Sequence, residues 1–297
     1  MRYVSNEEAA GILTPRRALE CVRRAFEAKR NSLLPHKLHL PYTDGKFFNI
    51  MPAVMQHEGI MGAKLVTSIS GRSSRVDADI LLYNAESGEL LAHMAAGFIT
   101  AQRTGAVAAL AVHKLARLGF RSLALAGLGA CGMATLHCLA ALYAEANLEL
   151  RLLRYKDHAQ QAIDSFSART NWKFCMAEST QELFYGADVC ISCLPQVQGL
   201  LATAEAFAPG CLVIPVHPYG FENCDTQFDR VVVDDKANAA TLPGYRMFRN
   251  CTEMADILSH MVRGRKRDSE RILCYCTGIA LHDLMCAKYI LEHLKAD

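Results

Sequence analysis

Several features that would place this chain in a membrane or on nucleic acid are missing from it. The 297 residues contain no apolar run of about 18 residues or more, so no membrane-spanning helix is expected. The formal net charge is only +2, and neither nucleic acid nor an acidic membrane is predicted as a partner. A short basic cluster at 263–267 is typical of a solvated connection. Residues 1–8 lack the apolar core of a signal peptide, and we expect a cytoplasmic protein.

The sequence also lacks a convincing metal site or disulfide framework. Its 12 cysteines are scattered through apolar segments, a distribution that favours buried free thiols. Cys190 and Cys193 form a C-x-x-C pattern, but it lies at the end of a predicted strand. His36, His39 and His282 have no metal-ligand spacing with a carboxylate or thiol. We therefore expect no metal.

What the chain does contain is enough apolar sequence for two domains. Hydrophobic residues make up 51% and charged residues 21% of the chain, as in a globular enzyme. A helix is predicted from Pro15 to about residue 32, followed by strands at 47–51, 61–66 and 79–84 that resemble an antiparallel sheet. A long alanine-rich helix is predicted over 100–118.

Strands and helices then alternate. Strands are predicted at 122–126, 148–153, 187–193, 212–216 and 231–234, with helices at 133–145 and 159–169. This alternation is typical of a parallel, doubly wound sheet of the Rossmann type. The final segment, about 274–294, is predicted to be helical.

A glycine-rich loop follows the first of these strands and opens a helix. It has the spacing G-x-G-x-x-G, in which Gly127 permits the tight turn, Gly129 lets a pyrophosphate approach the backbone, and Gly132 lets helix and strand pack closely. The pyrophosphate would lie at the helix N-terminus, close to Ala130 and Cys131. The loop predicts a dinucleotide cofactor.

The residues after the second strand bear on which dinucleotide is bound. An NAD site favours Asp or Glu there, whereas this chain has Arg154, Tyr155 and Lys156, with Asp157 only afterwards. Two cations suit a 2′-phosphate, so NADP(H) is the preferred cofactor and NAD(H) remains possible. In the alternative interpretation Arg154 and Lys156 are solvated and the loop brings Asp157 into place. Further candidate cofactor contacts are Thr104, Cys193 and Leu194.

Several segments, taken in order, resemble the ornithine cyclodeaminase/mu-crystallin family over nearly the whole chain. The most specific combination is the lysine segment followed by the Arg-Thr segment ahead of the glycine loop. The segments are 49–53 (NIMPA), 62–66 (GAKLV), 99–106 (ITAQRTGA), 186–191 with Pro209-Gly210, and 277–284 (TGIALHDL).

The resemblance implies an α/β protein in which a Rossmann-type, doubly wound parallel sheet is inserted into an α+β dimerisation and substrate domain. The discontinuous domain would comprise 1–113 plus 275–297, and the dinucleotide domain 114–274. The resemblance also implies a homodimer.

The resemblance further implies a substrate pocket lined by cations. The matching positions are Lys37, where the family more often has arginine, Lys64 and Arg103. A guanidinium binds a carboxylate through two parallel hydrogen bonds, and a strand lysine can hold a carboxylate, polarise an imine or supply a proton. Met51 and Gly278 are further candidate substrate contacts.

One departure from the family bears on the reaction. Ornithine cyclodeaminases carry an aspartate after the strand that matches 212–216, but residues 216–221 contain no carboxylate. His217 or Tyr219 is a candidate proton donor, and a structural role for either is equally compatible with the sequence. We interpret Asp283 as a helix-start residue or a dimer contact.

The predicted function is an NAD(P)-dependent oxidoreductase that transfers hydride at the α-carbon of a small amino, imino or keto acid, of the ketimine reductase or amino-acid dehydrogenase type. Two alternatives stay open at this point: an ornithine cyclodeaminase-type ammonia lyase that retains its NAD, and a non-catalytic, mu-crystallin-like protein that binds NADPH or another ligand.

Overall fold

The computed structural model describes residues 1–69 and 76–294 and divides into two compact units. Unit 1 comprises 1–103 and 278–297, and unit 2 comprises 104–277. The first boundary falls inside helix α3 (Gly97–Leu115), and the second falls just before helix α9 (Ala280–His293).

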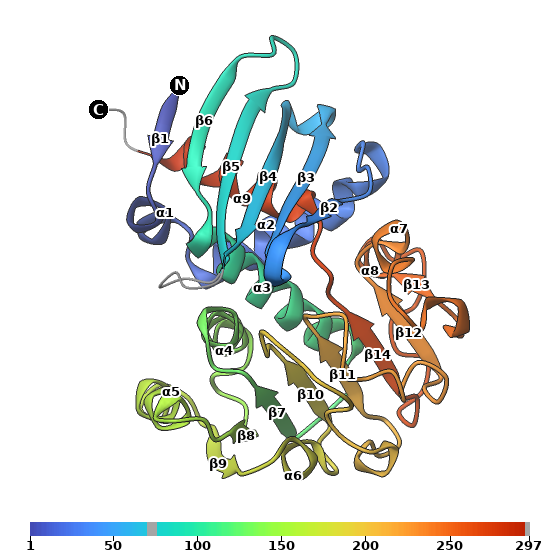
Figure 1. The fold of residues 1–297 in the computed structure, drawn as a ribbon. Helices are drawn as coiled ribbons and strands as arrows, with labels where there is room; N and C mark the ends of the chain where they lie inside the picture. The colour runs from blue at the N-terminus through green and yellow to red at the C-terminus, as the bar shows by residue number, and fades with distance from the viewer. Residues whose placement is uncertain (70–75, 295–297) are drawn as a thin grey trace. The chain divides into compact units, whose positions relative to one another are not determined.

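Unit 1 is built on a six-stranded sheet in the order β1-β6-β5-β4-β3-β2 (Figure 1). Neighbouring strands from β2 to β6 are antiparallel, as predicted, and β1 pairs with β6 in parallel. The strands are β1 (Arg2–Val4), β2 (Leu38–Pro41), β3 (Phe47–Met55), β4 (Ile60–Ser68), β5 (Val76–Asn84) and β6 (Leu90–Ala95), with helices α1 (Asn6–Ile12) and α2 (Pro15–Ala28) and 3-10 turns at Lys29–Asn31, Thr43–Gly45 and Gln56–Glu58.

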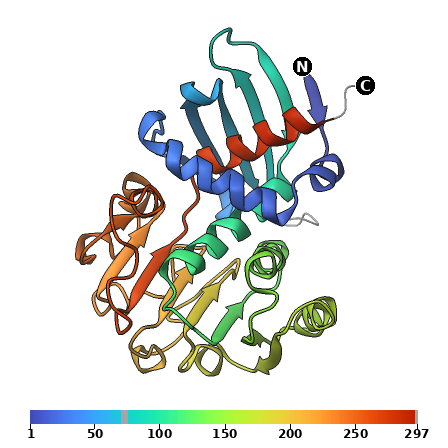
Figure 2. The ribbon, with the colours of Figure 1, turned by 180° about the vertical axis from the view of Figure 1, so that it is seen from behind.

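Helices α2 and α9 cover one face of this sheet (Figure 2). Helix α2 begins where the sequence predicts, because the Thr14 side chain accepts a hydrogen bond from the Arg17 backbone N–H and Pro15 occupies the first turn. Its buried stripe, which includes Val22 and Phe26, packs against α9. This face of the sheet is the one that carries Lys64, whose contacts are described below.

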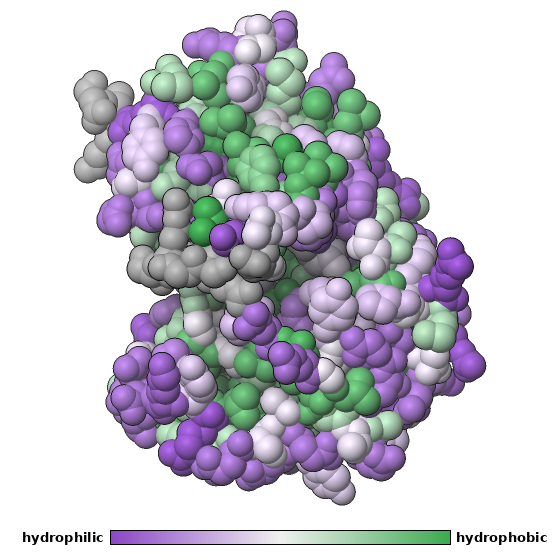
Figure 3. All heavy atoms as spheres, in the orientation of Figure 1, coloured by the Kyte–Doolittle hydropathy of each residue, from purple (hydrophilic) through white to green (hydrophobic). Residues whose placement is uncertain are grey.

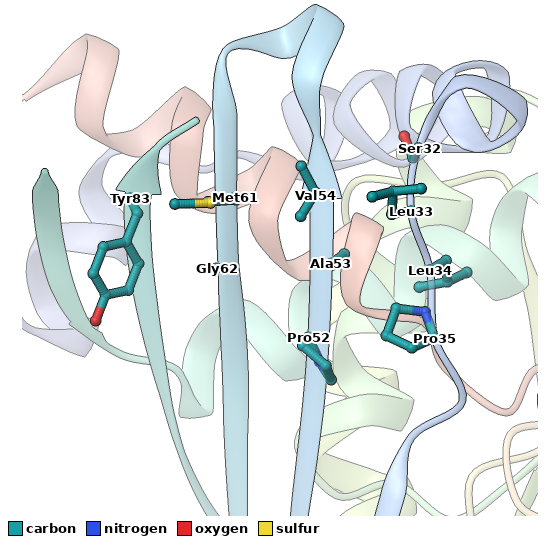
Figure 4. A pocket seen from close by; sticks show the side chains of 10 residues that line it. All are labelled: Ser32, Leu33, Leu34, Pro35, Pro52, Ala53, Val54, Met61, Gly62 and Tyr83. Atoms are coloured by element: carbon teal, nitrogen blue, oxygen red, sulfur yellow. The ribbon is translucent and has the colours of Figure 1, made fainter. Parts of the chain in front are cut away.

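The opposite face of the sheet carries an apolar groove. Pro52 and Val54 alternate along β3 with the buried Ala53 and Met55, so that they lie on the face turned away from α9 (Figure 4). The groove has a volume of about 770 Å³. Apolar residues gather over β3 to β5 in the space-filling view (Figure 3). The lining residues are Ser32, Leu33, Leu34, Pro35, Pro52, Ala53, Val54, Met61, Gly62 and Tyr83.

Unit 2 is a Rossmann-type unit with an eight-stranded sheet in which every pairing is parallel. The strand order is β13-β12-β14-β11-β10-β7-β8-β9, and its direction reverses between β7 and β10, which is where such sheets bind ligands. The strands are β7 (Ser122–Ala126), β8 (Glu149–Leu153), β9 (Lys173–Ala177), β10 (Val189–Ser192), β11 (Leu212–Pro215), β12 (Arg230–Val233), β13 (Thr252–Glu253) and β14 (Ile272–Tyr275).

The helices of unit 2 connect these strands. Besides the part of α3 after residue 103, they are α4 (Ala130–Tyr143), α5 (His158–Phe166), α6 (Thr180–Phe184), α7 (Lys236–Ala239) and α8 (Met254–Leu258), with 3-10 turns at Ala204–Ala206 and Tyr245–Met247.

One prediction about the end of the chain is wrong. The segment expected to be helical from about residue 274 begins as the fully buried strand β14, which lies between β11 and β12. The helix starts only at Ala280. It follows Gly278, whose φ of +82° changes the direction of the chain between strand and helix. A short, wholly apolar run has no periodicity that separates a buried strand from a buried helix.

In the part of the chain that the structure describes, no helix is both long and apolar enough to cross a membrane.

Candidate functional site

A cluster of three charged side chains lies buried in unit 1. Lys64 comes from β4, Arg103 from α3 and Asp283 from the first turn of α9. Lys64 Nζ lies 2.9 Å from each carboxylate oxygen of Asp283, and Arg103 Nε donates to Oδ1 at 3.0 Å. The three residues are 1%, 7% and 0% exposed. Taking an isolated charge out of water is costly. The Asp283 carboxylate offsets this cost for both cations because it pairs with each of them.

The strand register explains why Lys64 points at α9. Lys64 pairs with Met51 on β3 and with Ile80 on β5, and both neighbours are buried. Residues opposite each other in neighbouring strands share a face of the sheet, so Lys64 lies on the helix-covered face. Met51, a predicted substrate contact, is therefore directly beside Lys64.

Gly278 lies close to the Arg103 guanidinium and leaves space for it. Its φ of +82° is in the region that favours glycine. A Cβ atom at this position would lie 2.9 Å from Arg103 Nη1 and 3.2 Å from Nη2. A side chain at residue 278 would thus force the guanidinium to shift from this position.

His282, next to Asp283 in the chain, is buried and uncharged. Burial lowers its pKa well below the ordinary value, and the positive charges of Arg103 and Lys64 act in the same direction. Its ring packs edge-on against Phe26, with centroids 4.4 Å apart. A protonated ring would add a third positive charge to the cluster, so the neutral form fits this position.

Lys37 lies farther along the sheet. It is half-buried and immediately precedes β2, which pairs with β3 and not with β4. β3 therefore stands between the Lys37 segment and the strand that carries Lys64.

The glycine loop of unit 2 has the local geometry that the sequence predicts. Gly127 has a φ of +86°, and a Cβ there would lie 2.6 Å from the Cys193 carbonyl carbon. A Cβ on Gly132 would collide with the Gly127 carbonyl oxygen. Gly129 is the N-cap of α4, and a Cβ added there would meet no atom of the described residues within 4 Å, so its backbone faces open space. An anion that binds at a helix N-terminus needs open access of this kind to the backbone N–H groups.

The other candidate cofactor contacts near this loop differ in accessibility. Ala130 is exposed and Cys131 half-buried at the start of α4, whereas Thr104 is buried in α3. Cys193 and Leu194 are half-buried beyond the end of β10, and the Cys193 N–H donates to the Ala126 carbonyl at 2.8 Å. The dinucleotide loop and the end of β10 are thus joined at the point where the strand order reverses.

The segment after β8 carries exposed charges. Arg154 Nε donates to Glu178 Oε1 at 2.6 Å, although both side chains are more than half exposed. Lys156 has a left-handed φ of +48° and places its Nζ 5.4 Å from the centre of the Tyr155 ring. Glu178, which follows β9, therefore competes for the Arg154 guanidinium with any phosphate.

His217 is held by a hydrogen bond at the carboxyl edge of the parallel sheet. Its Nε2 lies 2.6 Å from Oγ of the buried Ser192, the last residue of β10. Burial lowers the pKa of His217 to about 4, so its ring is neutral at neutral pH. Tyr219 is 54% exposed.

The two nearest carboxylates beyond this segment are both engaged within unit 2. Glu222 Oε2 accepts from the Gly220 N–H at 2.9 Å. Asp225 is 1% exposed and accepts from the Tyr275 hydroxyl at 2.9 Å, and burial raises its pKa to about 6. Neither takes the place of the aspartate that residues 216–221 lack.

The chain thus combines a Rossmann-type unit with a second unit that holds a buried pair of cations. The chain belongs to the ornithine cyclodeaminase/mu-crystallin family, whose model matches residues 10–297. It is 23% identical to the nodulation efficiency protein NfeD of Rhizobium meliloti, over 98% of this chain and 95% of that protein. It is 27% identical to the ketimine reductase mu-crystallin of Rattus norvegicus, over 83% of this chain and 80% of that protein.

Among solved structures, the chain is similar to the Thermococcus litoralis Δ1-pyrroline-2-carboxylate reductase in complex with NADH and L-proline. The TM-score is 0.87 at 21% identity, covering 98% of this chain and 97% of that one. This likeness establishes the shared fold.

Sequence reasoning missed three residues that the structure brings into contact with candidate site residues. Asp283 does lie at the start of a helix, but its carboxylate holds Lys64 and Arg103. Glu178 and Ser192 pair with Arg154 and His217. The only indication in the sequence is an acidic residue in the 277–284 segment, and its contacts cannot be predicted from the sequence.

Proposed function

We propose that this chain is an NAD(P)H-dependent reductase that transfers hydride to the α-carbon of a small imino or keto acid. Unit 1 binds the substrate carboxylate through Arg103 and Lys64, and unit 2 binds the dinucleotide at the glycine loop. The observation that carries the proposal is the buried cation pair on Asp283, in a chain that also has an open glycine loop at a helix N-terminus.

The chemistry of the cation pair supports an α-carboxylate as its ligand. Arg103 uses Nε for Asp283, which leaves its Nη1–Nη2 edge to bind a carboxylate. Two parallel charge-assisted hydrogen bonds fix such a ligand in orientation as well as position. Lys64 supplies a second positive charge that stabilises electron density on the imine nitrogen or keto oxygen as hydride arrives.

The carboxylates of unit 2 favour net reduction over cyclodeamination. A cyclodeaminase needs an aspartate for the substrate amine, and here Glu222 and Asp225 are bound to Gly220 and Tyr275. The names of the relatives point the same way, since one is a ketimine reductase and one a Δ1-pyrroline-2-carboxylate reductase.

For the cofactor we propose NADP(H) over NAD(H). Arg154, Tyr155 and Lys156 follow β8, and the second strand of such a unit ends beside the adenosine ribose. Arg154 can leave the exposed Glu178 carboxylate for a 2′-phosphate at little cost, because surface ion pairs contribute little.

We further propose that the protein is a homodimer and that the apolar groove on β3, β4 and β5 lies in its interface. The groove is open and lined almost entirely by apolar side chains. Apolar surface of this kind on a sheet face marks interaction sites in globular proteins. Sedimentation would test this, and a monomer at micromolar concentration would contradict it.

The direct test of the enzyme assignment is spectrophotometric. Purified protein is mixed with NADPH or NADH and with Δ1-pyrroline-2-carboxylate, or with pyruvate plus ammonia, and absorbance of the reduced nicotinamide is followed. We expect absorbance to fall in proportion to the imine or keto acid consumed. Ammonia release from an amino acid with no net change in absorbance would instead establish a cyclodeaminase, and dinucleotide binding without turnover would establish a binding protein.

A further inference from the structure

We propose that Asp283 is a positioning residue that sets the geometry of both substrate-binding cations, while the missing side chain of Gly278 leaves space for the Arg103 guanidinium. The inference rests on the proposed function, because it concerns how that site orients its carboxylate ligand.

The geometry of Asp283 is that of a shared anchor. One carboxylate, fully buried in the first turn of α9, contacts a lysine from β4 and an arginine from α3. The lysine is 219 positions and the arginine 180 positions away in sequence. Since both bonds end on the same carboxylate, the separation of the two cations is set by one side chain.

The anchor also determines which edge of Arg103 faces a ligand. A guanidinium can present either its Nε–Nη edge or its Nη1–Nη2 edge to a carboxylate. The 3.0 Å contact with Asp283 uses Nε. A methyl group on Gly278 would lie 2.9 Å from Nη1, so the glycine leaves space beside this edge. Asp283 therefore holds the guanidinium through Nε, and Gly278 keeps the Nη1–Nη2 edge accessible to a ligand.

The helix that carries Asp283 is itself firmly held. Helix α9 packs against α2, β3, β4 and β5, and the neighbouring His282 is buried against Phe26. Leu284 Cδ2 would lie 3.1 Å from a Cβ on Gly62 in β4, so helix and sheet approach closely. A rigid support of this kind is what a substrate-orienting group requires.

The test compares Asp283→Asn with Cys286→Ala, a change at another fully buried position of α9, whose thiol forms its hydrogen bond with Cys21. Calorimetry measures binding of pyrrole-2-carboxylate, an unreactive planar carboxylate, to the NADPH-loaded proteins. It reports the number of competent sites separately from their affinity, so a purely structural defect lowers only the number. For Asp283→Asn we expect affinity per site to fall at least about tenfold, as when one charge-assisted hydrogen bond is misaligned, with NADPH affinity unchanged.

Turnover of Δ1-pyrroline-2-carboxylate gives the second measurement. We expect kcat/KM per competent site to fall about 100-fold in Asp283→Asn and to stay within about threefold in Cys286→Ala. Gly278→Ala, which displaces Arg103 and leaves Asp283 in place, should show the same pattern. It replaces Asp283→Asn as the test variant if Asp283→Asn does not fold.

The outcomes separate the two proposals. Equal carboxylate affinity in the wild type and both site variants overturns the positioning role. A wild type that binds pyrrole-2-carboxylate but never oxidises NADPH overturns the enzyme assignment, while the calorimetric comparison still decides on Asp283. A wild type that binds no carboxylate overturns both.

Discussion

The two units contain two different kinds of proposed anion-binding site. In unit 2 the site is made of backbone: glycines 127, 129 and 132 and the N-terminus of α4. In unit 1 it is made of side-chain charges, Lys64 and Arg103, held by Asp283. The first suits a pyrophosphate, which many N–H groups can contact from any side, and the second suits a small carboxylate that must be oriented.

The specificity of the two sites depends on different structural properties. A backbone site depends on the absence of side chains, so added atoms damage it. A side-chain site depends on the direction of a few donors, so even a change that preserves charge damages it. Four predictions sharpen this contrast, beginning with the largest effect.

Arg103→Lys keeps the charge of unit 1 but removes the planar fork. We expect kcat/KM for an imino acid to fall about 100-fold or more, because a misplaced reactant loses near-attack geometry. NADPH affinity, measured by fluorescence titration, should not change. The matched control is Arg17→Lys, an exposed arginine of unit 1 paired with Glu20, which should behave like the wild type. Full activity in Arg103→Lys would mean that a point charge is sufficient.

Gly129→Ala adds one methyl group to the backbone site of unit 2. The position is open and its φ of −76° suits alanine, so the melting temperature should not change. We expect the Kd of NADPH to rise about 10- to 100-fold, the loss of hydrogen bonds to a charged group. Gly132→Ala, in contrast, should lower the melting temperature because of its collision with the Gly127 carbonyl. An unchanged Kd in a folded Gly129→Ala protein would place the pyrophosphate elsewhere.

The third prediction concerns the preference for NADPH over NADH, for which we expect side-chain charges to act together with the backbone site of unit 2. Arg154→Ser should raise the Kd of NADPH about tenfold, by losing one charge-assisted contact, and leave that of NADH nearly constant. Glu178→Gln, which releases Arg154, should lower the Kd of NADPH by about two- to threefold. Titrations with both nucleotides test this, and an equal change for NADH and NADPH would contradict the 2′-phosphate assignment.

The last prediction concerns another buried carboxylate, that of Asp225. Asp283 is held by two cations, but Asp225 accepts from a tyrosine hydroxyl, and burial raises its pKa from the ordinary 3.8 to about 6. A raised carboxyl pKa contributes stability below pH 3.8 that is lost as pH rises through about 6. Asp225→Asn should therefore gain stability relative to the wild type over this interval, by about 1–3 kcal/mol at pH 7.

Urea unfolding at pH 4.5 and 7.5 measures that gain. Asp164→Asn, at an exposed position of α5, provides the control and should show no such trend. A constant difference between Asp225→Asn and the wild type at both pH values would show that the carboxyl titrates normally.

The same contrast explains how much the sequence alone could predict. The glycine loop, the strand before it and the helix after it are adjacent in the chain, and their geometry follows from local rules. Lys64 and Arg103 were predicted as a pair only through resemblance to a family. Asp283 was missed as their partner because its contacts cross 219 and 180 positions and depend on how α9 packs on the sheet. Strand β14 was missed because a short apolar run carries no periodicity.

The separation between Lys64 and Asp283 also orders events during synthesis. A ribosome that adds about 5–20 residues per second synthesises Asp283 roughly 10 to 45 seconds after Lys64. Unit 2 is contiguous from 104 to 277, so its whole sequence is translated before α9 exists. The complete sequence of unit 2 is therefore available for folding before Lys64 can meet its carboxylate partner, and the sheet of unit 1 is covered by α9 only at the end of synthesis.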